Sequence, residues 1–167
     1  MSNTQSSRTW RRRIGWGAAF VAASVAGVPL TAAAAPTTVS VYAQITSQAF
    51  GGPGCASPFD LCANGTIRGS LNGPFELAVT NAIPSPTPGV VFATAPVTFH
   101  DISGDLTCTE DFAYNATPGS DGEFGVICRI TGGTRRWSGA AGYLQGYGTV
   151  GPSGATTGTI VGKIRLP

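Results

Sequence analysis

The residue best suited to chemistry in this sequence is Glu110, an acid in the middle of an apolar alternating run. In a strand, this alternation places leucine, cysteine, phenylalanine and tyrosine on the same face as Glu110. If that face lines an apolar interior, burial raises the pKa of the carboxyl group. It could then transfer a proton or orient a polar group of a ligand. The alternative is that the strand is half-exposed here and Glu110 is solvated.

Aromatic side chains are the expected contacts of a ligand beside this acid. Phe75, Phe99 and Phe112 lie in the apolar phase of three separate segments, and Trp137 stands alone in a glycine-rich stretch. The glycines on both sides of Trp137 permit a sharp turn and close backbone approach. We therefore expect residues 130–144 to form a corner of a closed β structure, with Trp137 plugging one end.

The other chemistry-bearing residues give weaker patterns. His100 and Asp101 are adjacent, so in a strand they point to opposite faces and do not form a catalytic pair. His100 is the single histidine and no CxxC spacing occurs, which argues against a zinc site. We expect no metal and no cofactor.

Four cysteines allow three disulfide pairings. Cys55 and Cys62 bracket a short proline-containing loop. Cys108 and Cys128 flank a turn nearly symmetrically, and each shares the phase of the apolar residues on its own strand. We expect the pairs Cys55–Cys62 and Cys108–Cys128, which require an oxidising compartment.

The first 34 residues have the layout of a bacterial secretory signal peptide. A basic region is followed by an uncharged apolar stretch and by small residues that suit a signal peptidase. We place the cut after Ala34, which leaves 35–167 as one exported, extracellular domain. A retained membrane anchor is the alternative, but glycine and proline interrupt the apolar stretch, so we expect no membrane in the mature form. The arginines also suggest a twin-arginine leader, although the residues after them fit the general secretory route better.

Removing the leader leaves a weakly acidic chain. Four of the 10 basic residues lie in the leader and no acid does, so six basic and eight acidic residues remain. This balance lacks the basic patch that nucleic-acid binding requires. Abundant glycine, threonine and valine, with few helix formers, indicate an all-β protein.

Alternating apolar and polar residues predict eight strands. We expect a loop at 50–63, a tight turn at Asn72-Gly73 and a proline-rich connection at 83–89. Short connections predict a single eight-stranded antiparallel up-and-down β-barrel, with a two-sheet sandwich as the alternative. Glycines inside the last two strands favour the barrel, because they permit sharp bends. The expected strands are 39–45, 67–71, 75–79, 91–99, 106–114, 124–130, 144–150 and 160–166.

The second half of the chain carries a resemblance to a known family. Its residues are Gly104-Asp105-Leu106, Glu110, Gly122-Glu123-Phe124, Ile130-Thr131-Gly132-Gly133-Thr134 and Trp137-Ser138-Gly139-Ala140-Ala141-Gly142-Tyr143-Leu144. Together they resemble the allene oxide cyclase barrel and dirigent-like superfamily, in particular its bacterial secreted members. The resemblance implies a small, often oligomeric eight-stranded barrel of calycin-like type, acting on apolar small molecules. Arg135-Arg136 departs from the Gly-Arg often found there, and the first half of the chain matches nothing in the family.

Two functions from different classes follow. The first is a non-catalytic secreted barrel that binds an apolar small molecule or serves as an extracellular module, with a homo-oligomer among the expected assemblies. The second is a cofactor-free cyclase, isomerase or dirigent-type enzyme with Glu110 as its catalytic acid or base. The sequence favours the first, because one inward carboxylate is little equipment for catalysis. A hollow interior favours a ligand, whereas an interior filled by phenylalanines favours the module.

Overall fold

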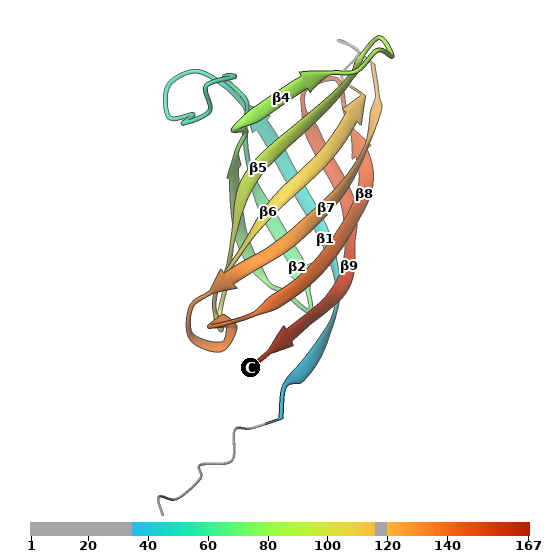
Figure 1. The fold of residues 1–167 in the computed structure, drawn as a ribbon. Helices are drawn as coiled ribbons and strands as arrows, with labels where there is room; N and C mark the ends of the chain where they lie inside the picture. The colour runs from blue at the N-terminus through green and yellow to red at the C-terminus, as the bar shows by residue number, and fades with distance from the viewer. Residues whose placement is uncertain (1–34, 116–119) are drawn as a thin grey trace, which may run out of the picture. The chain divides into compact units, whose positions relative to one another are not determined.

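The computed structural model describes residues 35–115 and 120–167, which are almost entirely β-strand (Figure 1). The predicted signal peptide lies outside these residues. Within them, no helix is long and apolar enough to cross a membrane. The elements are β1 (Thr37–Phe50), β2 (Cys62–Gly69), β3 (Gly73–Ala78), β4 (Asn81–Pro84), β5 (Val90–Asp101), β6 (Gly104–Asn115), β7 (Gly122–Gly133), the single-turn 3-10 helix η1 (Arg135–Trp137), β8 (Ala141–Val150) and β9 (Ala155–Leu166).

The strands close into a barrel of eight, and β4 is an additional strand. Antiparallel pairing runs in the order β3-β2-β1-β9-β8-β7-β6-β5, and β3 pairs back onto β5 to close the ring. β4 pairs with the first part of β5, where β3 has already ended. This architecture confirms the predicted eight-stranded antiparallel barrel and excludes the two-sheet sandwich.

Three predicted connections are present with different bounds. The expected loop at 50–63 is shorter, because β1 continues to Phe50 and β2 begins at Cys62. The turn at Asn72-Gly73 is a three-residue connection, 70–72. In it, the hydroxyl of Ser70 accepts a hydrogen bond from the Tyr42 N–H at 3.0 Å and donates one to the Tyr42 carbonyl at 3.1 Å. The proline-rich connection at 83–89 includes the end of β4.

Trp137 closes one end of the barrel, as the glycine-rich stretch around it predicted. Its side chain is completely buried, and the Arg136 guanidinium lies 4.9 Å from the centre of a ring of Trp137. The connections at this end are joined by Asp101, whose carboxylate accepts the Asn72 N–H at 2.9 Å and the Ser103 N–H at 3.0 Å. The fully buried aliphatic residues of the same core cluster are Ile67, Leu71, Leu106, Leu144 and Ile164.

Both predicted disulfides are present. Cys55–Cys62 closes the loop between β1 and β2, and Cys108–Cys128 joins β6 to β7. Cys108 and Cys128 are 2% and 0% exposed, so this bond lies inside the barrel wall, as the shared strand phase predicted.

Gly142 tests whether barrel closure depends on a glycine at the corner. Its φ of +145° is disfavoured for other residues, and a Cβ there would lie 2.2 Å from the Lys163 carbonyl oxygen of β9. We expect Gly142→Val to lower the free energy of unfolding by about 3 kcal/mol in a denaturant titration. The matched control is Gly125→Val, where a Cβ would meet no atom within 4 Å. Equal stability of the two variants would contradict the role assigned to Gly142.

Candidate ligand-binding site

The half of the barrel interior farther from Trp137 contains a cavity. A cavity of about 130 Å³ lies at the end opposite Trp137, where β1, β3 and β6 end and β7 and β9 begin. Its wall is mostly apolar and consists of Ile45, Ala49, Leu61, Cys62, Ala63, Phe75, Leu77, Val79, Phe112, Phe124, Val126 and Val150. Its polar residues are Ser47, Glu110, Tyr114 and Thr156.

Small residues on the neighbouring strands help to keep this half open. The Phe124 ring lies against the backbone of β8 and β9 at Gly148 and Gly158. A Cβ at either glycine would approach a ring atom of Phe124 to 2.7 Å. The ring therefore occupies space that side chains of β8 and β9 would otherwise fill. As a result, Phe124 lines the cavity and does not block it.

Glu110 lies in the cavity wall, as the alternation of β6 predicted. On its own strand it stands between Cys108 and Phe112, two residues away in each direction on the same face. Across the ladders its partners are Ala95 on β5 and Cys128 on β7. The short side chain of Ala95 leaves space beside the carboxyl group. Glu110 is half-buried and lines the cavity.

The Glu110 carboxyl group has no charged partner. Within 35–115 and 120–167, no hydrogen bond or ion pair reaches it, and burial raises its pKa from 4.5 to about 7. Arg129 follows Cys128 on β7, but its side chain is exposed on the outer face. A neutral carboxylic acid both donates and accepts hydrogen bonds, so near neutral pH this group can serve either as an acid or as a base.

The structure separates the four aromatic residues that the sequence suggested as ligand contacts. Phe75 and Phe112 line the cavity. Phe99 packs beneath Phe75, with ring centres 5.7 Å apart, and is 2% exposed within the filled half. Trp137 is the plug at the far end. The first two therefore share the cavity with Glu110, whereas Phe99 and Trp137 belong to the packed core.

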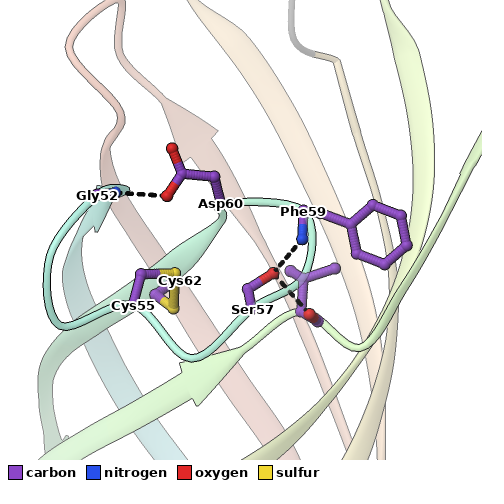
Figure 2. Close-up of a disulfide and its surroundings, with 7 residues drawn as sticks. Gly52, Cys55, Ser57, Phe59, Asp60 and Cys62 are labelled. Atoms are coloured by element: carbon purple, nitrogen blue, oxygen red, sulfur yellow. Dashed lines mark hydrogen bonds between the residues drawn. A yellow bond between two sulfur atoms is a disulfide. The ribbon is translucent and has the colours of Figure 1, made fainter.

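The disulfide loop between β1 and β2, drawn in Figure 2, leads into the cavity wall at Leu61 and Cys62. The Ser57 hydroxyl donates to the Val79 carbonyl at 2.7 Å and accepts the Phe59 N–H at 3.1 Å. The Val79 N–H donates to the Leu61 carbonyl at 3.0 Å, so the loop is attached where β3 gives way to β4. The Asp60 carboxylate accepts the Gly52 N–H, and the Phe59 ring is left 46% exposed.

His100 and Asp101 take no part in this cavity. His100 is exposed on the outer face, 3.0 Å from the Asp105 carboxylate and 3.8 Å from Glu76. Burial acts to raise the pKa of Asp101, but its hydrogen bonds, chiefly from Asn72 and Ser103, lower the pKa overall. In the described part of the chain, no three His, Cys, Asp or Glu side chains group as a metal site requires.

Among the polar and aromatic residues of the cavity wall, four were not among the site residues that the sequence suggested. Ser47 and Thr156 are paired across β1 and β9, and Tyr114 and Phe124 are paired across β6 and β7. Extending the alternation of 39–45 by one step would have placed Ser47 inside. Burial raises the pKa of Tyr114, which keeps its hydroxyl neutral and able to donate.

No family model, curated protein or solved structure matches this chain.

The raised pKa of Glu110 predicts a specific pH dependence of stability. The unfolded chain has the ordinary pKa of 4.5, whereas the folded barrel holds the proton up to about pH 7. The stability that the folded barrel gains by holding this proton on Glu110 is therefore complete below pH 4.5, and it is lost as the pH rises through 7. We expect the free energy of unfolding to fall by at most about 3 kcal/mol between pH 4.5 and pH 8. Glu110→Gln should lack this fall in parallel denaturant titrations. Identical pH profiles would mean that Glu110 is solvated.

Proposed function

We propose that this protein binds a small apolar molecule in the open end of its barrel, with Glu110 holding the polar group of that molecule. The observation that carries the proposal is one carboxyl group, without a charged partner, in a mostly apolar cavity. Apolar walls with a few placed polar groups are typical of small-molecule sites. A purely structural module has no use for an unpaired carboxyl group there, because burying it costs free energy.

The size of the cavity limits the ligand. A dry cavity of roughly 150 Å³ holds a benzene ring in another protein, and the cavity here measures about 130 Å³. The buried part of the ligand is then about one ring or a short alkyl chain. The cavity lies where the strands end, so a longer ligand extends past the disulfide loop.

Calorimetry with 1-hexanol tests the proposal. The apolar chain matches the cavity and the hydroxyl group matches Glu110, so we expect a dissociation constant below about 1 mM. Ser47→Phe places a ring in the cavity and should weaken binding at least about tenfold. Thr46→Phe adds the same ring on the outer face and is the matched control. Binding that Ser47→Phe leaves unchanged would locate the ligand elsewhere and refute the proposal.

A second candidate function is favoured by the pKa of Glu110. A value of about 7 suits a general acid or base at neutral pH, which a cofactor-free isomerase or cyclase requires. Under this proposal, Glu110 moves a proton within a bound apolar substrate, and no metal or cofactor takes part. The resemblance to the allene oxide cyclase barrel and dirigent-like superfamily supports this candidate, since it implies an eight-stranded barrel and this chain forms one.

Proton exchange tests the second candidate without knowledge of the substrate. Cyclohexanone fits the cavity, and abstraction of its α-protons in D₂O is followed by NMR. If Glu110 is a general base, the protein accelerates exchange above the buffer rate, and Glu110→Gln loses at least about 100-fold of that acceleration. Exchange at the buffer rate, with cyclohexanone bound, would remove the support for catalysis and leave the binding function.

Export belongs to the same proposal. Two disulfides suit an oxidising compartment, and the leader pattern of residues 1–34 suits secretion by a bacterium. N-terminal sequencing of the exported protein, expected to begin at Ala35, checks the cut.

A further inference from the structure

The charged side chains of the barrel are divided between its two ends. We name the half of the strands next to the disulfide loop the mouth half and the half next to η1 the plug half. In the mouth half the described charged residues are all acidic: Asp60, Glu110, Asp111, Asp121 and Glu123. Every described cation lies in the plug half: Arg68, Arg129, Arg135, Arg136, Lys163 and Arg165. Three acids, Glu76, Asp101 and Asp105, accompany them. The mouth half therefore carries a negative field, and Arg129, on the outer face of β7, lies at its border.

The cavity, like the mouth half, contains an acidic side chain and no cation among its lining residues. Of the cavity-lining residues, Glu110 and Tyr114 alone titrate, and a tyrosine hydroxyl stays neutral at physiological pH. The ladder neighbours that face Glu110 are Ala95 on β5 and Cys128 on β7, and neither is charged. Across the cavity, β1, β3, β8 and β9 contribute only apolar and hydroxyl side chains. A cation that enters therefore meets Glu110 as its one ionic partner.

The aromatic rings in the cavity wall also favour a positively charged ligand. Phe75, Phe112 and Phe124 line the cavity together with Tyr114. The faces of aromatic rings attract cations, most strongly where water is excluded, and they offer an anion nothing comparable. Organic ammonium groups are commonly bound between aromatic side chains and a carboxylate for this reason.

We propose that the ligand of this cavity is an apolar amine, whose protonated nitrogen pairs with the Glu110 carboxylate while its hydrocarbon part fills the aromatic-lined space. This rests on the proposed binding function and specifies its ligand class. A fatty or aromatic carboxylate is disfavoured, because two like charges would share a cavity with no cation. A neutral alcohol gains one hydrogen bond at Glu110 but neither the ion pair nor attraction to the acidic mouth.

Binding of the amine releases protons from the protein. The ammonium ion enters with its charge, and the fraction of Glu110 that is protonated gives its proton to the buffer as the ion pair forms. With the free carboxyl half-protonated near pH 7, about half a proton leaves per ligand at that pH, and about one at pH 5. Alkyl amines, like lysine, stay protonated over this range. Amine affinity should therefore rise roughly 100-fold from pH 5 to pH 8, whereas the affinity of an alcohol should not change.

The experiment compares hexylamine, 1-hexanol and hexanoic acid by calorimetry on the whole protein at pH 5 and pH 8. We expect hexylamine to bind at least about tenfold more tightly than 1-hexanol at pH 8, and hexanoic acid to bind most weakly. Repeating the hexylamine titration in buffers of different ionisation enthalpy measures the released protons directly in the wild-type protein. This measurement needs no variant and holds even if substitutions at Glu110 impair folding.

Two substitutions separate the interior charge from the surface charge. Glu110→Gln keeps the shape of the side chain and should remove the tenfold preference for hexylamine, the proton release and the pH dependence. Glu123→Gln removes one exposed acid from the mouth half and is the matched control. At 0.15 M salt, screening should limit its effect on hexylamine affinity to less than about twofold.

The outcomes distinguish this inference from the function on which it rests. Tighter binding of hexylamine, lost in Glu110→Gln and kept in Glu123→Gln, supports it. Binding of 1-hexanol that equals or exceeds binding of hexylamine, or a preference for hexanoic acid, overturns the amine assignment and leaves the apolar binding site standing. If none of the three ligands binds, both the site and its ligand class are refuted.

Discussion

The barrel depends on the short seam at which β3 pairs with β5. The seam contains three residue pairs, whereas the ladder between β1 and β9 contains twelve. Beyond the seam the chain leaves β5 near Val79 and returns to it as β4. The disulfide loop is hydrogen-bonded to Val79 at this departure point. The mouth of the barrel is therefore shaped by loop contacts, while the opposite end is held by continuous strand pairing and a buried tryptophan. The barrel is open at the mouth because the pairing between β3 and β5 stops before it reaches that end.

The interior is divided accordingly. Toward Trp137 the inward side chains are large and fill the space, and Phe99 forms the boundary beneath Phe75. Toward the mouth, glycines on β8 and β9 allow Phe124 to lie against the backbone, and the cavity remains. Glu110 lies at this boundary, next in phase to the Cys108–Cys128 disulfide. A carboxyl group held in a covalently braced wall keeps its position when a ligand enters, which is the preorganisation that an orienting group requires.

Strand alternation predicted most of the fold and the inward direction of Glu110, because an eight-stranded barrel gives every strand one buried face. β4 was missed, since four residues ending in proline carry too little pattern to identify a strand. The connection at 70–72 was misassigned, because Asn-Gly is a strong turn signal, whereas here Leu71 is buried and Ser70 bonds the backbone of β1. The sequence could not predict which of the aromatic residues line the cavity and which belong to the packed core. Whether Phe99 or Phe112 meets the cavity depends on how far along the barrel axis each lies, and that height is set by strand stagger between ladders rather than by any local pattern.

The two disulfides differ in what they report about the molecule. Cys55 is half-buried in the rim loop, so we expect an external thiol to reach Cys55–Cys62 while the barrel stays intact. Cys108 and Cys128 are sealed within the wall, so a reductant reaches them only after neighbouring strands separate. The rate at which the inner bond is reduced therefore measures how often the native barrel opens. Reduction of the outer bond should instead depend on the thiol concentration around the protein. One chain therefore contains one disulfide that reports opening of the barrel and one that reports the redox state outside it.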